Sequence, residues 1–176
     1  MKSRLLGALA ALFAFSGSSV WATTINYNLT NIAGNTWEYT YTVSNDTLGI
    51  AIEEFTTFFA VGDYQNLVAT ATPVDWDPLV IQPDPGLSDD GFYDALDLTA
   101  VGIAVGDSLG GFSVQFDFLG TGTPGNQHFV IIDPITFDVL DSGFTQVSAV
   151  PVPAALWLFG SGILALLGFV RGRISQ

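Results

Sequence analysis

The sequence contains no cysteine and only four basic residues in 176 positions. Without cysteine the chain can form no disulfide and no thiolate zinc site, and it has no cysteine nucleophile and no cysteine for a lipid anchor. A stable domain must therefore rely on a packed core. The basic residues all lie near the termini, at Lys2, Arg4, Arg171 and Arg173.

The middle of the chain is strongly acidic. All 17 acidic residues lie between Glu38 and Asp141, and no basic residue accompanies them, so the formal charge of this segment is −17. Charge of this size and sign predicts repulsion from nucleic acid and from anionic lipid surfaces. The same charge keeps a protein soluble, so acidity alone indicates neither a bound cation nor catalysis.

Residues that commonly perform hydrolysis are scarce. The only histidine, His128, directly precedes an apolar stretch, which favours a turn or strand-edge position over the general base of a nucleophile. Glutamate occurs only at Glu38, Glu53 and Glu54, and nothing selects a pair of carboxylates for glycoside hydrolysis. The glycine-rich segment 120–125 lacks the lysine of a phosphate-binding loop. We therefore expect a protein that is not an enzyme, with a carboxylate-dependent hydrolase as a remote alternative.

Residues 1–22 have the pattern of a secretory signal peptide. Lys2 and Arg4 precede an apolar run at positions 5–15, and a segment of mostly small residues ends at Ala22. Signal peptidase is expected to cut between Ala22 and Thr23, because a polar, strand-like pattern begins there. The chain should accordingly be exported.

The C-terminal segment predicts a membrane anchor. Positions 148–153 form a linker, the 17 residues at positions 154–170 carry no charge, and Arg171 and Arg173 follow in a basic tail at 171–176. A helix of this length spans about 25 Å, near the lower limit for crossing a bilayer. By the positive-inside rule the tail stays cytoplasmic, which places the preceding domain on the far side of the inner membrane.

The sequence Val-Pro-Val-Pro-Ala-Ala-Leu-Trp-Leu-Phe-Gly-Ser-Gly, which begins at Val150 and is followed by the apolar run and arginines, resembles the PEP-CTERM sorting tail of Gram-negative bacteria. The resemblance covers positions 150–173 and implies processing by an exosortase, a membrane cysteine peptidase. Pro151 and Pro153 correspond to the family's prolines, whereas Val152 replaces its usual glutamate. The two prolines favour an extended backbone at the membrane surface, a shape that peptidases bind.

Between positions 23 and 147 the apolar residues alternate with polar ones, as in half-buried antiparallel strands. The segments 25–29, 37–43 and 112–118 show this pattern most clearly, and about eight strands are expected in all. No helical periodicity of useful length interrupts them. The prediction is an all-β fold, a single antiparallel β-sandwich of Greek-key or jelly-roll type. Further expected strands are 50–60, 67–72, 103–105, 129–132 and 137–140.

Carboxylates gather in a segment rich in proline and glycine, which we expect to be an irregular loop. Calcium takes six to eight oxygen ligands, so these aspartates are candidates for a calcium site, although their spacing does not match the known calcium loop. No other cofactor is expected. The candidate ligands are Asp75, Asp77, Asp84, Asp89, Asp90 and Asp94.

Three aromatic residues lie in the same acidic segment, at Trp76, Phe92 and Tyr93. Aromatic rings stack against sugars, so they are candidates for carbohydrate binding, and anchoring in the core explains them equally well. The leading hypothesis is an exported surface or extracellular-matrix protein, held in the inner membrane with a periplasmic ectodomain and then moved to the cell surface or outside after exosortase processing. The family resemblance adds exopolysaccharide, as in a biofilm, as an expected partner. The alternative is a carbohydrate- or calcium-binding surface module.

Overall fold

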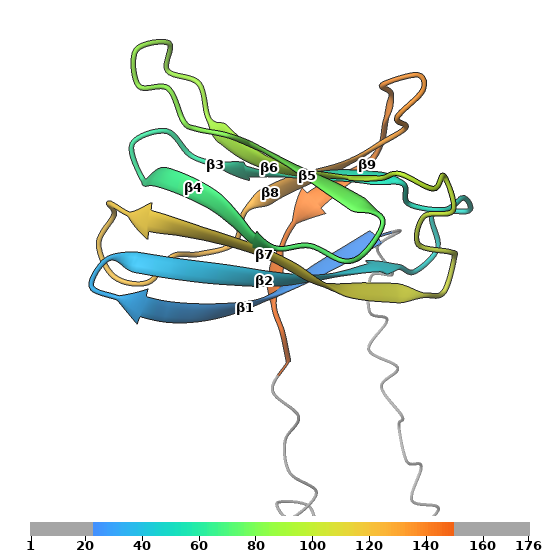
Figure 1. Cartoon of the computed structure of the whole chain (residues 1–176), viewed down its shortest axis with the longest axis horizontal. Helices are drawn as coiled ribbons and strands as arrows, with labels where there is room; N and C mark the ends of the chain where they lie inside the picture. The colour runs from blue at the N-terminus through green and yellow to red at the C-terminus, as the bar shows by residue number, and fades with distance from the viewer. Residues whose placement is uncertain (1–22, 150–176) are drawn as a thin grey trace, which may run out of the picture.

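The computed structural model describes residues 23–149, which form two five-stranded sheets packed face to face (Figure 1). Sheet I has the order β10-β1-β2-β7-β4, and sheet II has the order β5-β6-β3-β8-β9. The strands are β1 (Thr23–Ala33), β2 (Thr36–Asn45), β3 (Glu54–Phe59), β4 (Tyr64–Ala71), β5 (Trp76–Ile81), β6 (Gly91–Asp97), β7 (Ser108–Phe118), β8 (His128–Ile132), β9 (Val139–Phe144) and β10 (Gln146–Val147).

The predicted all-β sandwich is confirmed at the level of two packed sheets. Neighbouring strands are antiparallel except for β10, which pairs parallel with β1. No helix within residues 23–149 is long and apolar enough to cross a membrane. The predicted signal peptide, Pro151-Val152-Pro153 motif, membrane span and basic tail lie outside the described residues.

The alternation seen in the sequence gives each sheet one buried face. On β2 the side chains of Tyr39, Tyr41 and Val43 are completely buried, whereas the residues between them are partly exposed. The same period of two buries Phe112, Val114 and Phe116 on β7, where Ser113 is also buried. Because successive strand residues point to opposite faces, the apolar sets of the two sheets meet in one core.

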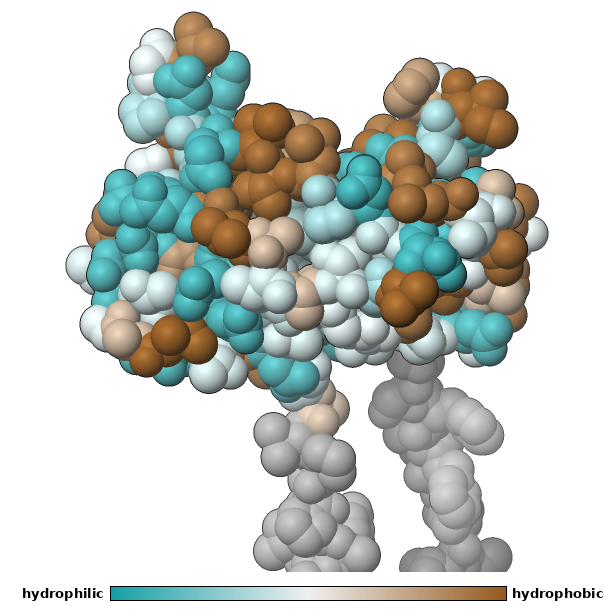
Figure 2. All heavy atoms as spheres, in the orientation of Figure 1, coloured by the Kyte–Doolittle hydropathy of each residue, from teal (hydrophilic) through white to brown (hydrophobic). Residues whose placement is uncertain are grey.

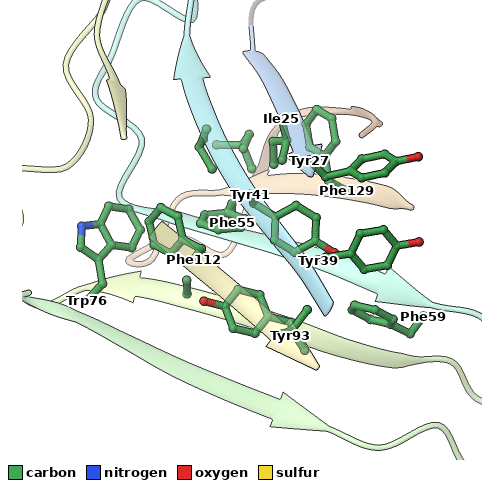
Figure 3. Packing of buried hydrophobic residues seen from close by; sticks show 14 of the residues in the cluster. Ile25, Tyr27, Tyr39, Tyr41, Phe55, Phe59, Trp76, Tyr93, Phe112 and Phe129 are labelled. Atoms are coloured by element: carbon green, nitrogen blue, oxygen red, sulfur yellow. The ribbon is translucent and has the colours of Figure 1, made fainter. Parts of the chain in front are cut away.

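Aromatic rings dominate this core (Figure 3). Tyr39 stacks on Phe116 from the neighbouring strand with ring centroids 4.8 Å apart. Between the sheets, Phe55 meets Phe112 edge to face at 4.9 Å. Large rings in these geometries bury much apolar area and add favourable ring–ring electrostatics. The chain thereby acquires a core without any disulfide.

The expected irregular loop over the acidic segment is wrong at both ends of the segment, and only the tip at 82–90 is irregular. The segment instead folds as the hairpin of β5 and β6, in which Trp76 pairs with Asp97 and Ile81 with Phe92. Trp76, Tyr93 and Ala95 alternate with outward residues and anchor both strands in the core. Long-range burial outweighed the turn-forming composition. The expected strand at 103–105 is reduced to an isolated bridge between Ile103 and Ile52.

Candidate functional site

The outer face of sheet II presents a row of ring side chains that crosses four neighbouring strands. Phe92 pairs with Phe58 in the β6–β3 register, and His128 pairs with Phe144 in the β8–β9 register. Because Thr57 pairs with Phe129, the next position along this antiparallel register brings Phe58 beside His128. We call Phe92, Phe58, His128 and Phe144 the aromatic row.

Ring spacing along the row is regular. The centroids of Phe92 and Phe58 are 6.4 Å apart, those of Phe58 and His128 are 5.5 Å apart, and those of His128 and Phe144 are 5.5 Å apart. The corresponding interplanar angles are 59°, 34° and 69°. The rings are thus contiguous but tilted, as expected on a twisted sheet.

The row is accessible from solvent. Phe144 is 59% exposed on the edge strand β9, His128 is exposed, and Phe58 and Phe92 are half-buried. Other exposed apolar residues extend the surface on β5 and β9, so the outer face is more apolar than a solvated sheet face requires. These residues are Leu79, Ile81 and Val139.

Two hairpin tips project beyond this face at opposite ends of the strands. They are the β5–β6 tip at 82–90 and the β8–β9 tip at 133–138, and they stand out at the upper left and upper right of Figure 1. Figure 2 shows apolar side chains gathered between these two projections. A hollow of about 710 Å³ lies against the β5–β6 tip and is lined by Phe58, Phe92, Asp84, Asp89 and Asp90, with Ile81, Gln82, Leu87 and Ser88 completing it.

The register row beside the rings contains polar as well as apolar side chains. Thr56 pairs with Asp94, and its Oγ1 donates a hydrogen bond of 2.6 Å to Asp94 Oδ1. Burial raises the pKa of Asp94, and the Thr56 hydrogen bond opposes that rise only in part. Burial and the negative charge of Asp94 also raise the pKa of Glu54, in the next row of the same face. The ionised forms of Asp94 and Glu54 are therefore less favoured on this face than they are in water.

The six aspartates predicted as calcium ligands are not brought together. In the part of the chain that the structure describes, no three histidine or acidic side chains are grouped so that they could hold a metal ion. The β5–β6 hairpin separates Asp75 and Asp77 at its base from Asp84, Asp89 and Asp90 at its tip. Asp84 Oδ1 instead accepts the Gly86 amide at 2.8 Å. The prediction of one shared calcium site is therefore wrong.

The remaining tip and strand carboxylates also have local roles. Asp90 Oδ1 accepts the Val61 amide at 2.8 Å, which ties the β5–β6 tip to the turn after β3. Asp94 is occupied by Thr56, as described above. Asp89 accepts no side-chain hydrogen bond within residues 23–149, although its backbone forms a bridge with Asp84.

Of the three aromatic residues predicted to face a ligand, only Phe92 lies on the outer face. Trp76 is 8% exposed and Tyr93 is fully buried, and both pack against the ring of Phe55 in the core. Sequence reasoning missed Phe58, His128 and Phe144. The usable signal was Phe58 itself, an aromatic residue between the inward positions Thr57 and Phe59 and therefore directed outward.

No family model matches the chain, and no curated protein matches it. Among solved structures it is similar to a cohesin module from a family 33 glycoside hydrolase of Clostridium perfringens, at 6% identity over 73% of this chain and 98% of that one, with a TM-score of 0.44. It is also similar to a family 3b carbohydrate-binding module of Clostridium clariflavum, at 11% identity over 69% and 96% of the two chains, with a TM-score of 0.44.

A chitin-binding domain from Streptomyces coelicolor is similar at 20% identity, over 61% of this chain and 90% of that one, with a TM-score of 0.38. Identities this low leave no residue-level correspondence between the chains. The likeness concerns the arrangement of strands, and the ligands belong to those proteins.

Proposed function

We propose that the protein is an exported, non-catalytic surface module that binds a carbohydrate chain along the aromatic row. The observation that carries the proposal is a register row of four outward ring side chains, of which His128 and Phe144 are exposed and Phe58 and Phe92 half-buried. Soluble proteins rarely leave contiguous apolar surface without a binding role. A twisted row of separate rings suits an extended ligand better than a compact one.

The aromatic row and the register row beside it together suit a sugar. A pyranose ring has apolar C–H faces that pack on aromatic rings, and hydroxyl groups around its rim that need hydrogen-bond partners. Asp94, which is partly exposed, and Ser142, which is exposed, lie in the register row beside the rings, whereas Thr56 of that row is buried and donates its hydroxyl to Asp94. Centroid spacings of 5.5 to 6.4 Å are comparable to the length of one pyranose residue.

The non-catalytic part of the proposal rests on where the carboxylates of this face lie. Glu54 and Asp94 are the carboxylates in the strands beside the row, and neither lines the hollow at the β5–β6 tip. Glycosidases place their two carboxylates on either side of the scissile bond, whereas these two project from one face. Release of reducing ends from a bound glycan would contradict the assignment.

Delivery to the surface rests on the sequence. We infer that the N-terminal segment directs export and that the PEP-CTERM-like tail is cut by an exosortase. The test compares the mass of the mature protein from a host with its exosortase and from a strain lacking that enzyme. Processing predicts a smaller protein in the first strain, and equal masses that both retain the tail would refute it.

The binding test uses the full chain purified in mild detergent, with affinity electrophoresis against a panel of soluble β-glycans. Phe144→Ala removes an exposed ring, and Phe58→Leu removes a half-buried ring while keeping most of its apolar volume. Each variant should weaken binding about tenfold, the equivalent of roughly 1.4 kcal/mol.

The matched control is Phe137→Ala. Phe137 is 76% exposed, but it lies in the β8–β9 tip, away from the row. Its loss should leave glycan affinity unchanged. The proposed site would be contradicted if Phe144→Ala and Phe58→Leu bound every glycan of the panel as tightly as the unmodified chain does.

A further inference from the structure

We propose that the ligand is a glycan bearing free amino groups, bound as a single chain whose ammonium groups face the acidic tip of the β5–β6 hairpin. This inference rests on the proposed function and specifies its ligand class. It is drawn from the charge around the aromatic row and from the tilt of the rings.

Charge on and near this face has one sign. Residues 23–149 contain no lysine or arginine, and the hollow at the end of the row combines Phe58 and Phe92 with Asp84, Asp89 and Asp90. Carboxylates accept charge-assisted hydrogen bonds from an ammonium group, and aromatic faces attract cations. The hollow therefore offers both kinds of partner that a protonated amine prefers.

Asp89 is the best-placed free acceptor of the three. Asp84 and Asp90 already accept backbone amides, whereas the carboxylate of Asp89 accepts no hydrogen bond from the protein within the described range. An exposed carboxylate beside a ring face can receive a ligand ammonium without breaking an existing contact. Asp89 is thus expected to contribute to affinity more than either neighbour.

The same charge selects against other glycans. An anionic polysaccharide such as a uronic acid polymer would bring like charges against a domain with a formal charge of −17, and no lysine or arginine within residues 23–149 offsets them. A neutral chain would gain the ring contacts alone. The expected order of affinity is therefore aminated, neutral and then anionic.

The tilt of the rings indicates that the ligand is a single glycan chain and not the flat surface of a crystalline polymer. Adjacent rings of the row differ in plane by 34° to 69°, so they cannot all lie flat against one rigid layer. A single flexible chain can rotate about its glycosidic bonds and follow the twist. Soluble oligomers should therefore compete fully with the insoluble form of the same polymer.

The experiment measures binding of the full chain to a matched pair of ligands, glucosamine oligomers and the same oligomers after chemical N-acetylation. Acetylation removes the ammonium charge and keeps the sugar backbone. We expect the aminated oligomer to bind at least several-fold tighter, and its advantage to shrink as the salt concentration rises, because ions screen exposed charges.

Asp89→Asn should weaken binding of the aminated oligomer about threefold and leave the acetylated one unchanged. The control is Asp107→Asn, which removes an equal charge in the loop before β7. Equal or tighter binding of the acetylated oligomer would overturn the ammonium inference while leaving carbohydrate binding intact. Binding of neither oligomer, or a stable dimer that buries the aromatic row in light scattering, would overturn the inference as a whole.

Discussion

At the scale of single residues, two tyrosines of the core differ in whether the hydroxyl has a hydrogen-bond partner. The hydroxyl of Tyr39 donates a hydrogen bond of 2.5 Å to the carbonyl of Gly125, where Gln127 Nε2 also donates at 2.5 Å. The hydroxyl of Tyr93 is buried and has no hydrogen-bond partner within residues 23–149. Desolvation raises the pKa of Tyr93 to about 12, so this hydroxyl stays neutral.

The two tyrosines predict opposite responses to loss of the hydroxyl. Tyr39→Phe should lower the free energy of unfolding by about 1–2 kcal/mol, since it deletes a buried donor and leaves Gly125 with one partner fewer. Tyr93→Phe should be neutral or slightly stabilising, because it removes a polar atom whose hydrogen bonding to water was lost on folding. Urea unfolding followed by tryptophan fluorescence measures both, and a larger loss for Tyr93→Phe would contradict this account.

At the scale of elements, the β5–β6 hairpin both anchors in the core and forms one wall of the site. Trp76 packs edge to face on Phe112 at 5.1 Å, across the two sheets. At the other end of the hairpin, Gly91 leaves room for Pro83, whose Cδ would lie 2.5 Å from a Cβ at position 91. The approach of these two residues sets the path of the tip that carries Asp84 and Asp89.

Gly91→Ala should therefore displace the hairpin tip and destabilise the fold by about 1–3 kcal/mol, as overpacking generally does. Because Phe92 is the next residue, glycan affinity should also fall. Thermal unfolding and affinity electrophoresis provide the two measurements.

Gly125→Ala is the matched control for this change. Its backbone is not in the left-handed region, and a Cβ there would meet no atom within 4 Å. Unfolding temperatures that are equal for the two glycine variants would show that the contact with Pro83 does not constrain the tip.

At the scale of the whole molecule, the charge of the folded segment has a single sign. With 17 acidic residues and no basic residue in the segment that folds, surface carboxylates repel one another, and no ion pair with lysine or arginine can form within residues 23–149. Individual groups respond in opposite directions. Burial raises the pKa values of Asp94 and Glu54, whereas hydrogen bonds from Thr36 and Asn66 lower that of Asp117.

These shifts predict greatest stability in acidic solution, near the ordinary pKa values of 3.8 for aspartate and 4.5 for glutamate. The folded chain holds protons on Asp94 and Glu54 more tightly than the unfolded chain does, so stability falls as pH rises through their raised pKa values. The stabilisation from ionised Asp117 is present above its ordinary pKa and is lost as pH falls through the lowered one. Thermal unfolding from pH 2 to 9 tests the optimum.

Salt supplies the companion measurement. Added sodium chloride should raise the unfolding temperature at pH 8, where the carboxylates are ionised, and should have less effect near pH 4.5, where repulsion is weaker. An unfolding temperature that is insensitive to salt at pH 8 would show that the acidic surface does not oppose folding.

The sequence alone determined the class of fold and much of its core. Alternation on segments such as 37–43 and 112–118 is a local property of the chain, because a strand turns every second side chain to the same face. The absence of cysteine and of central basic residues likewise needed no structure to interpret. The predictions for export, sorting and membrane anchoring also rest on the sequence.

Tertiary structure decided which aromatic residues face outward together. Phe58, Phe92, His128 and Phe144 are up to 86 positions apart in the chain, and only the pairing of β6, β3, β8 and β9 sets them in one row. Composition misassigned the acidic segment for the same reason: burial of Trp76 and Tyr93 between the sheets outweighs its turn-forming residues. Strand register is a long-range property, and no local pattern in the chain specifies it.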